Sequence, residues 1–147
     1  MQCRLRNANI NDAELILEWR NDVTSISHSR NTTMISLEEH LKWFQKKIND
    51  PDCSIFILTS GDDNVGMLRI EKKKDVGEIS FIIAPLHRGH GFGKKIIELA
   101  EKSLVDGVKA LIGFVKKDNF ISQNCFQKND YCCFDSMDCY CFIKVLH

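Results

Sequence analysis

The sequence predicts a mixed α/β fold in a single domain, with a mostly antiparallel central sheet flanked by helices. Two stretches with apolar residues at helical spacing lie near the beginning, and a third follows a glycine-bearing loop in the middle. Between them, three short apolar runs are separated by turn residues, which is typical of an antiparallel meander. The length of 147 residues suits one compact domain, residues 1–147, with one sizeable core.

The N-terminal third is predicted to contain one strand and two helices. Residues 1–10 alternate loosely and indicate an opening strand, after which Asn11-Asp12 can cap a helix over 13–20. Residues 21–33 are polar, lack periodicity and are expected to form a loop. A capping box at Ser36 and Glu39 starts the second helix, and Pro51 ends it.

The rest of the chain alternates between strands and helices. The meander is expected over 54–59, 65–71 and 77–84, and the next helix over 94–106, starting at about Gly91. A buried strand is expected over 108–115 and a short helix over 119–129. Two strands over 131–134 and 139–145 are expected to form a closing hairpin. The resulting order is β-α-α-β-β-β-α-β-α-β-β.

Composition excludes several classes of function. Lys plus Arg and Asp plus Glu number 20 each, so no net charge draws the protein to nucleic acid or to an anionic membrane. No apolar stretch approaches the ~20 residues of a membrane span, and no N-terminal signal is recognised, so a cytoplasmic protein is expected. Five of the seven cysteines fall within 125–141 without zinc-type spacing, which indicates reduced, packed thiols and no metal site.

The most informative stretch is a glycine loop between an apolar strand and a helix. It contains Arg88-Gly89-His90-Gly91-Phe92-Gly93 and is followed by Lys94 and Lys95. Glycines let backbone N–H groups come close to a ligand, and the helix start adds free N–H groups and a positive dipole end. Together with the cationic side chains, this suits a pyrophosphate. The alternative is a plain glycine turn, because glycine turns alone are common.

Two motifs in the sequence resemble those of the GNAT superfamily of N-acetyltransferases. Arg88, Gly91 and Gly93 match its acyl-CoA signature, Arg/Gln-x-x-Gly-x-Gly/Ala. The second motif is similar over Asn119-Phe120-Ile121-Ser122, Phe126, Lys128 and Tyr131, although Asp130 replaces its usual glycine. The resemblance covers essentially the whole chain and implies the superfamily fold with acetyl-CoA as cofactor. It implies cofactor contacts from Asn119, Ser122, Phe126 and the loop residues Arg88, Gly89, His90, Gly91, Phe92, Gly93 and Lys94.

The resemblance also implies how the reaction is catalysed. In this family the fourth strand diverges from its neighbour, so the N–H groups of Phe81, Ile82 and Ile83 are expected to hold pantetheine and the thioester oxygen. Glu78 is the candidate base for the amine proton, and an exposed strand glutamate is the alternative.

The residue that protonates the departing thiolate is left open by the sequence. Phe126 stands where many members of the family have a tyrosine in that role, and a phenylalanine cannot donate a proton. Tyr131 is the candidate replacement, with Cys125 or water as alternatives, or the thiolate leaves unassisted.

The acceptor is expected to be a small-molecule amine bound by the first two helices and the intervening loop. Residues 18–22 and 36–44 resemble the aminosugar N-acetyltransferases of pseudaminic acid biosynthesis, which acetylate the 4-amino group of a UDP-linked dideoxy sugar. The candidate contacts are Arg20, Asn21, Arg30, His40, Trp43 and Phe44, some of which are equally expected as core or surface residues.

Two other functions stay open at this point. They are a protein N-terminal acetyltransferase of the ribosomal-protein type and a non-catalytic acyl-CoA-binding module. A monomer or a homodimer is expected, because residues 139–145 are predicted to form an exposed hairpin edge that could pair between subunits.

Overall fold

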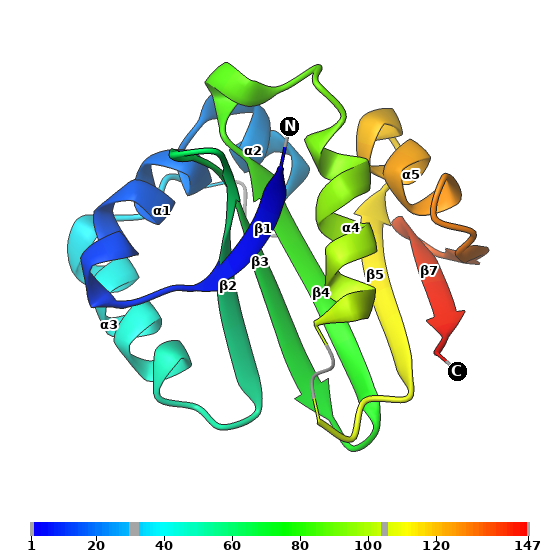
Figure 1. Ribbon diagram of the computed structural model, residues 1–147. Helices are drawn as coiled ribbons and strands as arrows, with labels where there is room; N and C mark the ends of the chain where they lie inside the picture. The colour runs from blue at the N-terminus through cyan, green and yellow to red at the C-terminus, as the bar shows by residue number, and fades with distance from the viewer. Residues whose placement is uncertain (1, 30–32, 104–105, 147) are drawn as a thin grey trace.

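The computed structural model describes residues 2–29, 33–103 and 106–146, which form one sheet covered by helices on both faces (Figure 1). The sheet order is β1-β2-β3-β4-β5-β7-β6, and β4 with β5 is the parallel pair. The strands are β1 (Cys3–Asn7), β2 (Cys53–Ser60), β3 (Asp63–Lys73), β4 (Val76–Ile83), β5 (Ala110–Lys116), β6 (Cys132–Ser136) and β7 (Cys139–Val145). The helices are α1 (Ala13–Arg20), α2 (Val23–His28), α3 (Leu37–Ile48), α4 (Phe92–Lys102) and α5 (Phe120–Gln127).

The predicted mixed fold is confirmed. The meander β2-β3-β4 turns first at Gly61, whose φ of +61° favours glycine, and the bounds of its three strands lie within two residues of those expected. The opening strand is shorter than the expected 1–10 and spans Cys3–Asn7. The helix expected to reach residue 106 ends at Lys102, and residues 104–105 lie outside the described part of the chain.

The loop predicted over 21–33 is wrong for six of its residues, which form the short helix α2. No apolar periodicity announces this helix, because none of its residues is buried. It begins where the Asp22 side chain accepts a hydrogen bond from the Ser25 N–H at 3.3 Å. The start of α2 is therefore marked by its capping residue and not by a hydrophobic pattern.

The cap expected from Asn11-Asp12 is also wrong. The residue that caps is Asn9, whose side chain accepts from the Asn11 N–H at the start of a short 3-10 turn leading into α1. The Asp12 carboxylate instead accepts two hydrogen bonds from Arg6, at 2.8 and 2.9 Å, which join β1 to this turn.

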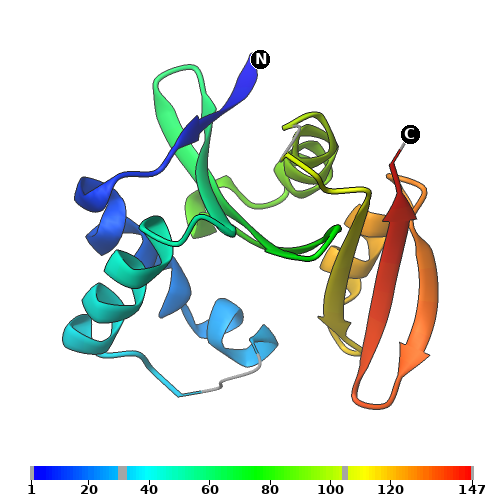
Figure 2. The ribbon, with the colours of Figure 1, turned by 90° about the horizontal axis from the view of Figure 1, so that it is seen from below.

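The core has two parts, one on each face of the sheet. Figure 2 shows α4 on one side of the twisted sheet and α1 with α3 on the other. The α4 side packs apolar residues such as Ile96, Ile97 and Phe126 against β3, β4 and β5. The other side packs Ile16 and Phe44 against β2 and β3.

The exposed hairpin edge predicted at residues 139–145 is not an edge. β7 lies between β5 and β6 and pairs with both, so β6 is the terminal strand. The burial pattern gives the reason, because Phe142 of β7 is fully buried whereas all five residues of β6 are exposed.

The described ranges contain no helix with both the length and the apolar character needed to cross a membrane. Within the same ranges, no group of three or more His, Cys, Asp or Glu side chains is placed to hold a metal ion. The seven cysteines are free thiols.

Candidate functional site

A fork opens between β4 and β5. Their parallel pairing runs only from Val76–Ala110 to Ile79–Gly113. Beyond this point β4 stays paired with β3 and β5 stays paired with β7. Figure 2 shows the two strands diverging, so their facing edges are not paired with each other at this end of the sheet.

The backbone groups that face the fork can be assigned from the ladder. The Ala84 N–H donates to the Val65 carbonyl at 2.8 Å, and the β3–β4 register continues from this pair without a shift. Because backbone groups alternate sides along a strand, Ile82 directs its N–H and carbonyl at β3. The predicted contribution of Ile82 is therefore wrong, and the fork is lined by the backbone groups of Phe81 and Ile83.

The glycine loop leaves β4 at the same end of the sheet. Gly89 and Gly91 have φ of +80° and +82°, and a Cβ built on either would meet no atom within 4 Å. Gly91 is the N-cap of α4, and no side chain of the described residues caps that helix. The open backbone and the free first-turn N–H groups, at the positive end of the helix dipole, fit the pyrophosphate of acetyl-CoA.

Two loop residues predicted to bind the cofactor, Phe92 and Gly93, are needed for packing at the positions of their side chains. Phe92 is 5% exposed and belongs to the core. A Cβ on Gly93 would lie 2.7 Å from Cys125 Sγ, so glycine is needed there for α4 to approach α5. Phe92 and Gly93 can therefore offer a ligand only their backbone N–H groups at the start of α4. The side chains of His90 and Lys94, by contrast, are exposed.

The Arg88 side chain points away from the loop towards α2. Its guanidinium donates to Asp22 Oδ2 at 2.8 Å and to Ser25 Oγ at 3.0 Å. Burial works to raise the pKa of Asp22, but the hydrogen bonds from Arg88 and the Ser25 N–H outweigh it and leave that pKa lowered. The ion pair connects the cofactor loop to the helix that the sequence did not predict.

The residues of the second motif are largely structural in their side chains. Asn119 Oδ1 accepts from the Ser122 N–H at 3.2 Å and thereby caps α5. Phe126 is 2% exposed and stacks on Phe142 at 5.1 Å between ring centroids, which corrects its predicted cofactor contact to a core position.

The hydroxyl predicted to replace the missing tyrosine is not presented to the fork. The Tyr131 hydroxyl is buried and has no hydrogen-bond partner among the described residues. Burial, and then the charge of Glu101, raise the pKa of Tyr131 far above its usual value. Cys125 Sγ lies instead beside the first turn of α4 and near the Phe81 ring, and burial raises its pKa as well.

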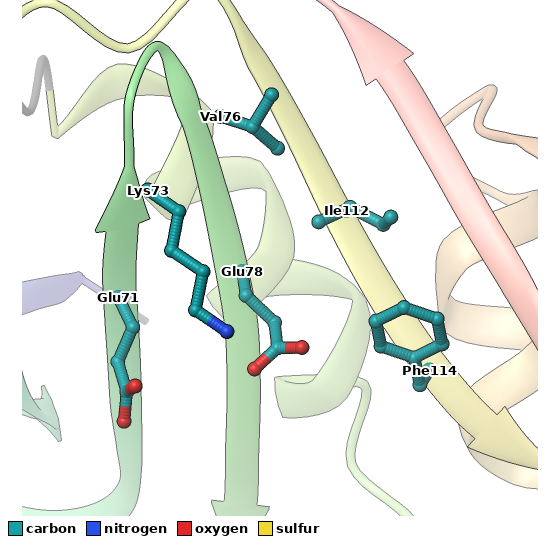
Figure 3. Close-up of a pocket in the computed structure, with 6 residues that line it drawn as sticks. All are labelled: Glu71, Lys73, Val76, Glu78, Ile112 and Phe114. Carbon is teal, nitrogen blue, oxygen red and sulfur yellow. The ribbon is translucent and has the colours of Figure 1, made fainter.

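A pocket of about 400 Å³ lies on the sheet face opposite α4, over the paired part of β4 and β5 that leads up to the fork. It is lined by Glu71, Lys73, Val76, Glu78, Ile112 and Phe114. Figure 3 shows the Lys73 side chain extending between the carboxylates of Glu71 and Glu78, which are cross-strand partners. Glu78 is thus part of a pocket wall, as the base hypothesis requires.

Beside this pocket, Arg20 and Trp43 meet a residue that the sequence did not suggest. The Cζ atoms of Arg20 and Arg69 lie 4.2 and 5.1 Å from the centroid of the Trp43 ring. Burial, and then the charge of Arg69, lower the pKa of Arg20 to about 10. Strand alternation from Met67 to Glu71 was the available signal, because it places Arg69 on the same face as Glu71.

Three other predicted acceptor contacts are structural. His40 is fully buried, with Nε2 2.6 Å from the Ala13 carbonyl and Nδ1 3.1 Å from Arg20 Nη1. Phe44 is fully buried in the core. The Asn21 side chain makes two hydrogen bonds of 2.8 Å with the Ile35 backbone. Arg30 lies outside the described residues.

The fork and the uncapped glycine loop define a protein of the acyl-CoA-binding transferase class. Residues 14–131 match the acetyltransferase (GNAT) family, and the chain belongs to this family. It is an acetyl-CoA-dependent N-acetyltransferase.

Acetyltransferases are among its relatives and structural neighbours. Acetyltransferase PseH of Campylobacter jejuni (serotype O:23/36, strain 81-176) is 27% identical over 130 residues, 86% of this chain and 81% of that protein. The uncharacterized N-acetyltransferase YfmK of Bacillus subtilis is 30% identical over 95 residues, 64% of this chain and 62% of that relative. The Vibrio cholerae spermidine N-acetyltransferase, solved with CoA and spermine, superposes with a TM-score of 0.87 at 17% identity, over 98% of this chain and 95% of that one.

Proposed function

We propose that this N-acetyltransferase acetylates a primary amine on a small molecule, namely the 4-amino group of a UDP-linked dideoxy sugar. The observation that supports the proposal is the pocket that leads up to the fork, because Glu78 lines it and an acceptor bound there would lie close to a thioester held in the fork. The resemblance of residues 18–22 and 36–44 to the aminosugar enzymes, and the match to PseH over most of both chains, support this acceptor.

In the proposed reaction the acceptor nitrogen forms a bond to the acetyl carbonyl carbon and the carbon–sulfur bond breaks. The proton of the amine passes to Glu78, directly or through a water molecule. Glu78 and Ser80 share the pocket face of β4, since they are two residues apart on one strand.

The developing negative charge on the carbonyl oxygen needs donors that are already in place. The N–H groups of Phe81 and Ile83 are fixed by the β3–β4 ladder and face the fork, so they need no reorganisation during the reaction. Removing a single donor of this kind typically lowers the rate by about 10²–10³.

The thiolate departs without a phenol in this protein. Phe126 has no acidic proton, and the Tyr131 hydroxyl is buried away from solvent. Because a thiol has a pKa of about 8.5, its thiolate is a tolerable leaving group that water can protonate. Cys125, which is partly buried near Phe81, is the alternative donor.

The test is acetyl-CoA-dependent thiol release with a UDP-linked 4-amino-4,6-dideoxy sugar beside short peptides and simple polyamines. Release with the sugar supports the proposed acceptor. Release with a peptide or a polyamine alone would keep the enzyme class and overturn the acceptor. Acetyl-CoA binding without turnover on any amine would favour the non-catalytic module.

A further inference from the structure

The Arg20 side chain has an uncompensated charge in a partly buried position. Its guanidinium contacts the neutral ring of His40 and lies over Trp43. No carboxylate of the described residues forms an ion pair with it, and the second influence on its pKa is another cation, Arg69. A guanidinium in such a setting is normally paired with an anion, because removal of a charge from water is costly.

Arg69 is only partly compensated. Its Nε lies 3.1 Å from Glu71 Oε1 without the alignment of a hydrogen bond, and its Nη2 donates weakly to Ser80 Oγ at 3.4 Å. Glu71 is shared with Lys47, whose Nζ lies 3.2 Å from the same oxygen. Arg69 and Lys47 therefore share one carboxylate, and Arg20 lies with Arg69 over the Trp43 ring without a carboxylate of its own among the described residues.

The aromatic ring fixes the two guanidiniums in one place. Trp43 is half-buried on α3, while Arg20 comes from the end of α1 and Arg69 from the middle of β3. Cation–π contact holds both groups against the same ring, where their mutual repulsion would otherwise separate them. The fold thus builds a preorganised positive site out of three separate elements.

We propose that the Arg20–Trp43–Arg69 cluster binds a phosphate or diphosphate group of the acceptor and thereby positions its amine at Glu78. This inference deepens the proposed function and rests on it for the role of the amine. Arg69 is the new specificity-determining residue, and Arg20 acts with it. Paired guanidiniums suit this ligand because each can offer two parallel N–H donors to phosphate oxygens.

The register supplies the spacing between the two halves of the acceptor. Arg69 pairs with Ser80 and Glu71 pairs with Glu78, so Arg69 and Glu78 are diagonal neighbours on one face. Diagonal neighbours of an antiparallel pair are about 7–8 Å apart. An acceptor with its amine and its phosphate on opposite sides of one sugar ring can reach both sites at once.

The first test measures binding without any acetyl transfer. UDP is titrated by calorimetry into protein saturated with CoA, so that the glycine loop is already occupied. The wild type is expected to bind UDP, and Arg20→Gln and Arg69→Gln are each expected to weaken the affinity about tenfold or more. Arg4→Gln, an exposed arginine of β1, is the matched control and should leave the affinity unchanged.

Arg20→Lys keeps the charge, so it should retain part of the affinity even if the glutamine variants unfold. Absence of UDP binding by the wild type would overturn the inference. Losses in Arg20→Gln and Arg69→Gln that are no larger than in Arg4→Gln, in variants shown by thermal melting to be folded, would overturn it as well.

The second test separates the inference from the proposed function. For Arg20→Gln, kcat/KM is expected to fall about tenfold or more with the UDP-linked amino sugar and less than about threefold with the same free sugar. Equal losses on both substrates would contradict a phosphate subsite. If only peptides or polyamines are acetylated, the proposed acceptor fails, while the UDP titration still decides whether the cluster binds phosphate.

Discussion

Gly113 lies where the β4–β5 pairing ends, and replacing it with alanine tests why Phe126 is a core residue. An ideal Cβ at Gly113 would lie 2.4 Å from Phe126 Cζ, 2.9 Å from Cε1 and 3.1 Å from Cε2. The ring cannot simply retreat, because the rings of Tyr131 and Phe142 lie with centroids 5.0 and 5.1 Å away. Gly113→Ala must therefore displace a closely packed aromatic cluster.

The expected cost follows from two opposing effects. Overpacking a core costs about 1–3 kcal/mol, and a contact of 2.4 Å with a fully buried ring favours the upper half of that range. Replacing glycine by alanine offsets about 0.4–1 kcal/mol through the lower entropy of the unfolded chain. The net loss should be about 1.5–2 kcal/mol, which lowers Tm by roughly 3–8 °C for a domain of this size.

Urea denaturation and thermal melting of the two proteins measure this loss. The control is a double-mutant cycle with Phe126→Leu, which removes the ring atoms that the new Cβ would meet. In that background Gly113→Ala should cost much less than in the wild type. A neutral Gly113→Ala, or an equal cost in both backgrounds, would refute the packing argument.

Three further predictions concern the loop, the base and pH. Gly91→Val should sharply raise the Kd for acetyl-CoA, because a β-branched residue is strained at φ +82° and its side chain fills the open space above the loop; calorimetry showing an unchanged Kd would exclude this cradle. Glu78→Gln should lower kcat most at low pH, where the amine is protonated, with the affinity for acetyl-CoA kept; a pH–rate profile that overlays the wild type would show that Glu78 is not the base. The pKa of His40 is lowered by burial despite the hydrogen bond to the Ala13 carbonyl, so His40 binds a proton more readily in the unfolded chain than in the folded protein. The free energy of unfolding should therefore fall as the pH drops below about 6.5, by at most ~1.4 kcal/mol per pH unit from this group, and His40→Gln should flatten that slope in urea denaturation.

The alternation of apolar and polar residues and the spacing of the glycines determined the strands, the loop and the helix that form the site. The three runs of the meander, the loop from Arg88 to Gly93 and the helix after it are local features, because period-2 patterning, turn residues and helix starts depend on neighbours in sequence. The family followed from the same local motifs, and the position of Glu78 on the pocket face followed from strand alternation.

Several features depended on partners distant in sequence, so only the tertiary structure decided them. α2 has no buried residue to mark it, and Arg88 reaches it across 66 residues to bind Asp22. The sequence does not show whether the N–H group of Ile82 faces the fork or β3, because this depends on the hydrogen-bond register between β3 and β4. β7 lies inside the sheet because β5 offers it a partner edge, which no local pattern encodes.

The acceptor side shows the same division. Sequence proposed Arg20, His40, Trp43 and Phe44 together, but burial assigns His40 and Phe44 to the core. Trp43 and Arg20 meet Arg69 only because α1, α3 and β3 converge at one place. Local chemistry thus determined which residues are able to bind a ligand, whereas packing between distant segments decided which of them are presented to one.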